Sequence, residues 1–207
     1  MRKVFFDLET GGLDPNRHPI IQIAAIAVDV DLNELDVFEA KVDFDMAAAD
    51  PDALAKNSYN REVWDRESVS PLSACNELSR FLKPFTDVQM ISPRTGMPYY
   101  VAQLIGHNSH SFDAPFLQAM YRQQKQFLPA GFLTLCTLQK ALHYFNDRPD
   151  LRKPENFKLE GLCKYFGVPL EGAHDALADV RATLAMYRAL RAAEMKELIP
   201  ARAGALA

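Results

Sequence analysis

The chain begins with two apolar segments separated by a stretch that can continue neither of them. Residues 3–8 (KVFFDL) and 20–30 (IIQIAAIAVDV) are short and partly aromatic or β-branched, whereas residues 9–19 (ETGGLDPNRHP) are rich in turn-forming residues. Short apolar runs bounded by turn formers are typical of β-strands. The alternating segment 36–44 (DVFEAKVDF) follows. We therefore predict three consecutive strands joined as hairpins.

Helical and extended patterns alternate through the rest of the chain. A helix is expected to start at Ser70–Pro71, with an apolar side made of Leu72, Leu78, Phe81 and Leu82. Residues 86–100 predict a hairpin around a Pro-Arg-Thr-Gly turn. Strands are then expected at 101–106 and 132–137, and helices at 114–125, up to about 145, and at 158–166 and 175–197. This order predicts one mixed-sheet α/β domain over 1–197, with helices on both faces and a short tail at 198–207.

Composition limits the possible classes of protein. The 207 residues are 48% hydrophobic and 24% charged, which is ordinary for a globular domain. No apolar run is long enough for a membrane span or a signal peptide, so no membrane contact is expected. The widely spaced Cys75, Cys136 and Cys163 form no zinc motif, which favours free buried thiols and a cytoplasmic location. The net charge of −4 gives no sign of a phosphate-rich partner unless divalent metals supply positive charge locally.

Two acidic residues end the first predicted strand. Asp7 and Glu9 follow Val4, Phe5 and Phe6, and residues two apart on a strand point to the same face. Two neighbouring carboxylates repel each other unless something positive binds them. An exposed strand end would explain the pair without any function, so alone it is a weak signal.

Two further acidic positions and a histidine lie near predicted helix starts. Asp113 precedes an apolar helix, where it would serve as an ordinary N-cap, and the same explanation applies to Asp175. Asp179 lies among small apolar residues, and acids are rare in such an environment unless they are paired or bind metal. His174 is five residues earlier, about 140° around a helix, so we expect it at or before the helix start. The alternative interpretation is that His174 is a solvent-exposed loop residue without a function.

Taken together, the acids and the histidine predict one kind of chemistry. Four carboxylates without a matching cluster of Lys or Arg imply hard cations. Two magnesium-class ions are the usual means of stabilising the attacking and leaving oxygens in phosphoryl hydrolysis. Histidine is the side chain that ordinarily titrates near neutral pH, so His174 is the candidate to deprotonate water.

Three segments resemble the motifs of the DnaQ-like 3′–5′ exonucleases, in particular the DEDDh subgroup. They are FFDLETGGLDP, GHNSHSFDAPFL and HDALADVRATL, and the order and flanks of the motifs agree over residues 4–187. KLEGLCKYFGV also resembles the helix that precedes the third motif in this family. The letters DEDDh correspond to Asp7, Glu9, Asp113, Asp179 and His174.

The resemblance implies a ribonuclease H-like fold, with a mixed five-stranded β-sheet and helices on both faces. It implies that the four acids bind two Mg²⁺ or Mn²⁺ ions and that His174 is the general base. Thr10, Gly11 and Leu13 would contact the terminal nucleotide, with Leu13 wedged against its base. Asn108 would lie near the substrate, and Phe112 would pack under the sheet. The partner would be a nucleic acid, DNA or RNA, with a free 3′ end.

Alternative functions and weaker features remain open at this point. A proofreading subunit of a DNA polymerase would use the same chemistry, although only residues 198–207 follow the last predicted helix. A catalytically inactive nucleic-acid-binding module would have no reason to keep the unpaired acids. The basic stretch Arg148, Arg152, Lys153 and Lys158 is either a solvated loop or a phosphate clamp. Tyr59 and Trp64 either stack on a base or belong to the core. The role of 86–100, longer than a minimal family member needs, is not implied by the resemblance.

Overall fold

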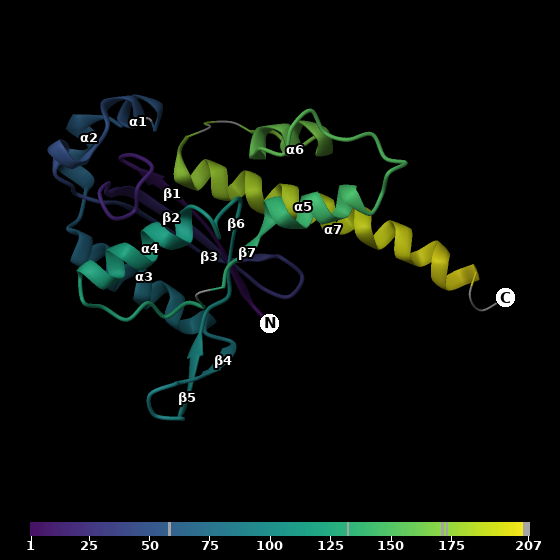
Figure 1. Ribbon diagram of the computed structural model, residues 1–207, viewed down its shortest axis with the longest axis horizontal. Helices are drawn as coiled ribbons and strands as arrows, with labels where there is room; N and C mark the ends of the chain where they lie inside the picture. The colour runs from purple at the N-terminus through teal and green to yellow at the C-terminus, as the bar shows by residue number, and fades with distance from the viewer. Residues whose placement is uncertain (58, 132, 171, 173, 205–207) are drawn as a thin grey trace.

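The first three strands form an antiparallel meander, as the apolar segments predict. In the computed structural model, which describes residues 1–57, 59–131, 133–170, 172 and 174–204, they are β1 (Lys3–Thr10), β2 (Ile20–Val28) and β3 (Glu34–Lys41) (Figure 1). Two strands, β6 (Leu104–Gly106) and β7 (Leu135–Cys136), extend the sheet on the other side of β1, each parallel to its neighbour. The order β3-β2-β1-β6-β7 is a mixed five-stranded sheet, as predicted.

Alternation along β1 directs its side chains to two different helical layers. Val4, Phe6 and Leu8 belong to a core with α3 (Pro71–Leu82) and α4 (Asp113–Gln123). On the opposite face, Phe5 packs against α7 (Ala176–Gly204). Helices therefore cover both faces, which confirms the predicted fold class.

The remaining helices complete these layers. They are the 3₁₀ turns η1 (Met46–Ala48) and η2 (Lys83–Phe85) and the helices α1 (Pro51–Lys56), α2 (Arg61–Glu67), α5 (Thr137–Asn146) and α6 (Leu159–Phe166). α5 and α6 share a hydrophobic cluster with α7, and Figure 1 shows the three side by side. As expected, α6 ends at Gly167, whose left-handed φ of 67° suits glycine.

Four details of the predicted elements are wrong. The strand expected over 101–106 is divided, because Val101 ends β5 (Pro98–Val101) and the sheet strand β6 covers only Leu104–Gly106. The strand expected over 132–137 is reduced to β7, because the chain enters α5 at Thr137; residue 132 lies outside the described residues. Leu72 is exposed because it lies in the first turn of α3, outside the buried side formed by Leu78, Phe81 and Leu82. The last helix does not end near 197 but continues through Pro200 to Gly204, where alanines favour helix strongly.

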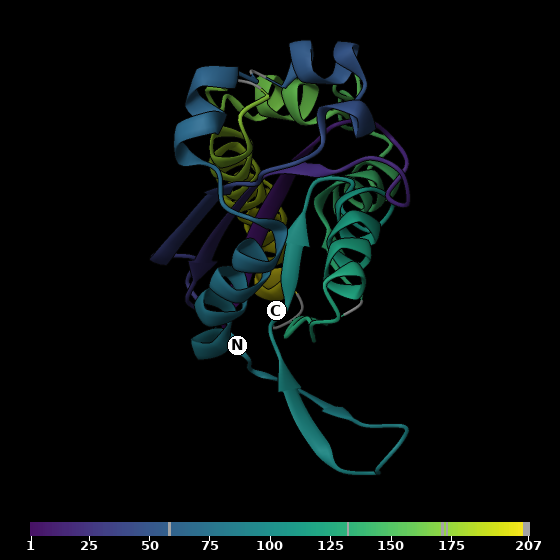
Figure 2. The same cartoon turned by 90° about the vertical axis from the view of Figure 1, so that its left-hand side faces the viewer.

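Residues 86–100 form the predicted hairpin. β4 (Val88–Ile91) and β5 (Pro98–Val101) pair antiparallel as a separate two-stranded sheet. Figure 2 shows this hairpin projecting away from the rest of the molecule. Among the described residues, no helix combines the length and apolarity needed to cross a membrane.

Cys75, Cys163 and Trp64 belong to the packed interior rather than to a surface site. Cys75 and Cys163 are buried free thiols, as predicted, whereas Cys136 is only half-buried because it lies in the short edge strand β7. Trp64 is buried, and its Nε1–H donates to the carbonyl of Ile21 at 3.1 Å. The ring of Tyr59 lies 5.1 Å from that of Trp64. Both rings are engaged in packing, and Trp64 also makes a hydrogen bond, which supports the core alternative for these two residues.

Candidate active site

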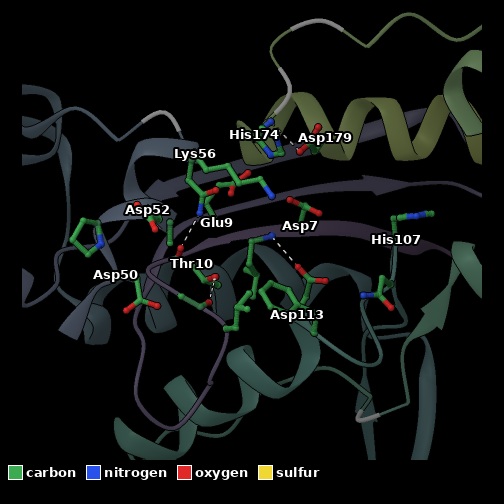
Figure 3. Close-up of a pocket in the computed structure, with 18 residues that line it drawn as sticks. Asp7, Glu9, Thr10, Asp50, Asp52, Lys56, His107, Asp113, His174 and Asp179 are labelled. Atoms are coloured by element: carbon green, nitrogen blue, oxygen red, sulfur yellow. Dashed lines mark hydrogen bonds between the residues drawn. The ribbon is translucent and has the colours of Figure 1, made fainter. Parts of the chain in front are cut away.

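Strand β1 presents Asp7 and Glu9 to the start of α7. Both residues share the strand face of Phe5, whose ring meets that of Tyr187 in α7 at 5.3 Å. Asp179 lies in the first turn of the same helix. One carboxylate oxygen from each of the three acids can be chosen so that all lie within 4.8 Å of one another. The strand and the helix thus bring together three of the four predicted acids, as Figure 3 shows.

Asp113 reaches the same cleft from the opposite helical layer. It is not the N-cap that the sequence suggests: Phe112 occupies that position, and Asp113 is the first residue of α4. Its side chain, 3% exposed, accepts a hydrogen bond from the backbone N–H of Leu8 at 3.2 Å. The carboxylate is therefore held against β1, beside Asp7, instead of capping its own helix. Phe112 packs against the core that α3 and α4 share, as expected.

His174 lies immediately before α7, as helical geometry requires. It has a left-handed φ of 68°, and its backbone N–H donates to Asp179 Oδ2 at 3.3 Å. Its side chain is exposed and lines the cleft together with Asp179. The next residue, Asp175, accepts a hydrogen bond from Ala178 N and another from Gln22 Nε2, at 3.1 and 3.0 Å. Asp175 is thus the N-cap that the sequence indicates, and it also ties the histidine's loop to β2.

The loop after β1 is held in place by the segment around α1. Asn57 donates its side-chain amide to the carbonyl of Thr10 at 2.8 Å, and Asp50 N–H donates to the carbonyl of Gly11 at 2.7 Å. A Cβ on Gly11 would lie 2.8 Å from Ala49 Cβ, so glycine is required there by packing. Leu13, in contrast, is 81% exposed and lines the cleft. A fixed loop therefore presents an unpacked leucine beside the acids.

The acids and the loop line one cleft of about 660 Å³, which also contains residues that the motif letters do not identify. Asn108 lines it, as predicted. So does His107, whose Nε2 lies 3.1 Å from the carbonyl of Phe157 and whose Nδ1 lies 3.0 Å from Thr137 Oγ1. Because a carbonyl only accepts, Nε2 carries the proton, and burial lowers the pKa of this imidazole. His107 thus links the cleft to neighbouring segments; its position beside Asn108 in the second motif is the sequence signal that could have identified it.

Among the described residues that line the cleft, Lys56 is the one lysine or arginine. Figure 3 shows its side chain extending from α1 over Glu9. The basic residues Arg148, Arg152, Lys153 and Lys158, by contrast, do not line the cleft; Arg148 lies over the ring of Tyr144 at 5.4 Å. The sequence did not predict a role for Lys56, because it belongs to no motif and a lysine is an ordinary residue on a short polar helix.

Burial and mutual repulsion make the ionised acids unfavourable in the metal-free protein. Burial, with the charges of Asp113 and Glu9, raises the pKa of Asp7 well above its usual value. Burial followed by the charge of Asp179 raises the pKa of Glu9 to about 8, although Lys56 opposes this shift. Burial alone raises the pKa of Asp113 to about 7, and it also raises the pKa of Asp179. A carboxylate-rich cluster with such shifts fits a divalent cation, which would remove the repulsion.

The same shifts predict how metal binding depends on pH. At pH 6 the carboxyls of Glu9 and Asp113 hold protons in the metal-free folded state, so a cation must displace them. The unfolded chain has already lost these protons, so the stability of the metal-free protein falls as pH rises toward 8. We expect the increase in melting temperature caused by Mg²⁺ to be larger at pH 8.5 than at pH 6. Melting curves with Mg²⁺ and with EDTA at both pH values measure it, and a shift independent of pH would contradict the argument.

Comparison with protein families shows which known proteins this chain resembles. A family model described as Exonuclease, of the RNase T type, matches residues 4–83 and 99–187. An oligoribonuclease of Corynebacterium efficiens is 29% identical over 187 residues, which cover 86% of this chain and 72% of the relative. An oligoribonuclease of Aromatoleum aromaticum is 27% identical over 191 residues, covering 91% of each chain.

Solved structures agree with this match at the level of the fold. The zinc-bound complex of Escherichia coli exonuclease I with single-stranded DNA superposes with a TM-score of 0.74 at 22% identity. The alignment covers 92% of this chain and 40% of that one, so this chain spans well under half of exonuclease I. A complex of the same enzyme with a dT13 oligonucleotide gives a TM-score of 0.71 at 22% identity, covering 90% and 40% of the two chains.

Proposed function

The chain belongs to the RNase T exonuclease family, and we propose that it releases nucleoside monophosphates stepwise from the 3′ end of a nucleic acid. The observation that carries this proposal is the convergence of Asp7, Glu9 and Asp179 within 4.8 Å, in a cleft that also holds Asp113 and His174. The exonuclease domain, proposed over residues 1–197, contains all of these residues.

The four acids would hold two Mg²⁺ or Mn²⁺ ions. When bound, such a pair stabilises the attacking and leaving oxygens of a phosphoryl group. Asp7, Glu9 and Asp179 offer oxygens close enough to share a cation, while the hydrogen bond from Leu8 N orients Asp113 beside them. The raised pKa values of Glu9 and Asp113 support the same assignment, since a cation relieves the cost of their ionised forms.

His174 would act as the general base. Its imidazole takes a proton from the water molecule whose oxygen forms the new bond to phosphorus. The bond between phosphorus and the 3′ oxygen of the preceding nucleotide then breaks, and that oxygen ends as a 3′-hydroxyl after gaining a proton. The products are a nucleoside 5′-monophosphate and a chain shortened by one. The exposed imidazole beside Asp179 supports this role, because the cap of Asp175 and its bond to Gln22 fix the approach of the loop.

The loop after β1 would select a chain end. Thr10, which lines the cleft next to the acids, is anchored by Asn57 and would meet the terminal sugar. The N–H and the carbonyl of Gly11 are bonded to Pro19 and Asp50, so Gly11 would shape the loop rather than contact the sugar through its backbone. Leu13 would lie against the terminal base, a contact that needs no particular base, and Asn108 would contact the substrate from the second motif. This arrangement supports an exonuclease with little sequence preference.

Replacing Leu13 by alanine tests the end-binding role. Leu13→Ala should raise KM for an oligonucleotide about tenfold, because burying a leucine side chain against a base is worth about 1.5–3 kcal/mol. The Mg²⁺-induced increase in melting temperature should not change, since Leu13 provides no ligand. Leu35→Ala, in the exposed leucine of β3, is the matched control and should leave KM unaltered. Equal KM values for all three proteins would remove Leu13 from the substrate site.

The substrate class requires a direct comparison. The curated relatives are named oligoribonucleases, whereas the structural neighbours bind single-stranded DNA. Matched DNA and RNA oligonucleotides, single- and double-stranded, should be incubated with the protein in Mg²⁺, in Mn²⁺ and in EDTA. The proposal expects mononucleotide products that depend on the metal, and it fails if all of these substrates stay intact. Pull-down with a DNA polymerase separates a free-standing enzyme from a proofreading subunit.

A further inference from the structure

The β4–β5 hairpin is an addition to the exonuclease domain whose outer surface the proposed function does not use. The family match stops at residue 83 and resumes at residue 99, so it omits β4, the turn and the start of β5. Figure 1 shows the hairpin at the lower end of the molecule, whereas α1 and the start of α7, which border the cleft, lie at the upper end. The hairpin therefore does not border the acidic cleft.

Cross-strand register divides the hairpin into an inner and an outer face. Val88 pairs with Val101 and Met90 with Tyr99, and these four side chains are buried or half-buried. The alternate pairs are Gln89 with Tyr100 and Ile91 with Pro98, and all four of these side chains are exposed. Alternation along strands places each set on one face. The outer face is thus apolar and aromatic, and nothing in the described chain covers it.

Neighbouring contacts define this surface. Met97, beside the turn, is more than half exposed. The ring of Phe127, which follows α4, meets that of the inner-face residue Tyr99 edge to face at 5.9 Å, which ties the 122–130 segment to the inner side of the hairpin. On the outer side, the hydroxyl of Tyr100 donates to Gln89 Oε1 at 3.4 Å across the two strands. The flat ring of Tyr100 is therefore held at a defined position on an exposed support.

The hairpin and the segments next to it carry exposed cations. Lys83, Arg94 and Lys125 are exposed, and the ion pairs of the described residues include none of them. The acid of the 83–101 segment, Asp87, is neutralised by bidentate hydrogen bonds from the guanidinium of Arg2. This cationic set contrasts with a net charge of −4 for the whole chain. An anionic partner with flat apolar groups complements it, which describes single-stranded nucleic acid better than a second copy of this acidic chain.

We propose that the outer face of the β4–β5 hairpin, with Tyr100 and Arg94, binds the single strand at a distance from its 3′ end. The inference rests on the proposed function, because the same strand would enter the cleft. Residues 98–106 run from the hairpin to the second motif, and at about 3.3 Å per residue they span about 26 Å. A stacked strand rises about 3.4 Å per nucleotide, so about eight nucleotides separate the two sites. Short oligonucleotides would reach only the cleft, and long ones would reach both.

The test compares substrates of 4 and 20 nucleotides, as DNA and as RNA. Tyr100→Ala and Arg94→Glu should each raise KM for the 20-mer about tenfold, in line with the loss of one base–aromatic stack, while kcat and the KM of the 4-mer stay unchanged. Arg94→Glu should also flatten the salt dependence of binding to the 20-mer. Lys196→Glu, an equal charge reversal on the exposed surface of α7, should have no length-specific effect.

Binding of a 5′-fluorescein 20-mer, measured by anisotropy in EDTA, separates this inference from the proposed function. If no substrate is degraded but the 20-mer still binds, and Tyr100→Ala weakens that binding, the proposed function fails and the hairpin site stands. KM changes that are equal for both lengths, or absent, would overturn the hairpin site. A dimeric wild-type protein would also overturn the hairpin site if Tyr100→Ala or Arg94→Glu converted it to a monomer without a length-specific change in KM. The face would then bind a second copy of the chain.

Discussion

Replacing Asp7 by asparagine should reduce hydrolysis about a thousandfold while making the metal-free protein more stable. Asp7 belongs to the acidic cluster with Glu9 and Asp179, so the amide removes a ligand from the proposed metal site. It also removes a carboxyl whose ionised form is disfavoured in the folded protein, because burial and the charges of Asp113 and Glu9 raise the pKa of Asp7. Each pKa unit relieved corresponds to about 1.4 kcal/mol, and we expect a gain on the order of 1 kcal/mol at pH 8.

Three measurements check this expectation together. Initial rates on a single-stranded oligonucleotide give the loss of activity, and urea denaturation in EDTA gives the free energy of unfolding. The Mg²⁺-induced rise in melting temperature should be much smaller in Asp7→Asn, because a weaker site stabilises less by mass action. Asp36→Asn, on the exposed surface of β3, is the matched control and should change none of the three quantities. An active Asp7→Asn protein with an undiminished Mg²⁺ effect would refute the metal assignment.

Replacing His174 by asparagine should lower kcat by about 10²–10⁴, which is the usual worth of a general base. Asparagine suits this test because it tolerates the left-handed φ of 68° at this position better than most residues do. The hydrogen bond from the backbone of residue 174 to Asp179 does not involve the imidazole, so the acid should keep its place. The Mg²⁺-induced increase in melting temperature should therefore be preserved.

The combination of a low kcat with intact metal binding distinguishes a general base from a ligand. His143→Asn, in the exposed histidine of α5, is the control and should retain full activity. If His174→Asn retains a rate near that of the wild type, another group accepts the proton. His107 is a poor candidate for that role, because its Nε2 proton is directed at the carbonyl of Phe157 and its Nδ1 faces Thr137.

The local pattern of the sequence predicted those parts of the site that follow from a single element. Alternation along β1 sufficed to put Asp7 and Glu9 on one face, and the helical angle between His174 and Asp179 sufficed to place the histidine before α7. Asp113 shows the limit of such reasoning. An aspartate before a helix is ordinarily its cap, and only the packing of α4 against β1 reveals that Leu8 N is its partner.

Residues that contact distant segments of the chain could not be predicted from the local sequence pattern. Asn57 is an ordinary residue at the end of α1, yet its buried amide anchors Thr10, 47 positions away in the sequence. Lys56 lines the cleft because α1 lies beside the loop after β1, and the sequence does not reveal this packing. The shortness of β7 was equally hidden, because the apolar residues of 132–137 fit a longer strand as well as they fit the start of a helix. In each case, tertiary packing decided among options that are locally equivalent.

The central claim, removal of nucleotides from a free 3′ end, is tested most directly by a linear oligonucleotide and its closed circle. A 5′-labelled single strand incubated with the protein and Mg²⁺ should give a ladder that shortens one nucleotide at a time, while the unlabelled product accumulates as mononucleotides. The circle of the same sequence should remain intact, because the loop of Thr10 to Leu13 is proposed to accept only a terminus. Efficient cutting of the circle, or release of the 5′ label as the first product, would contradict the proposed function.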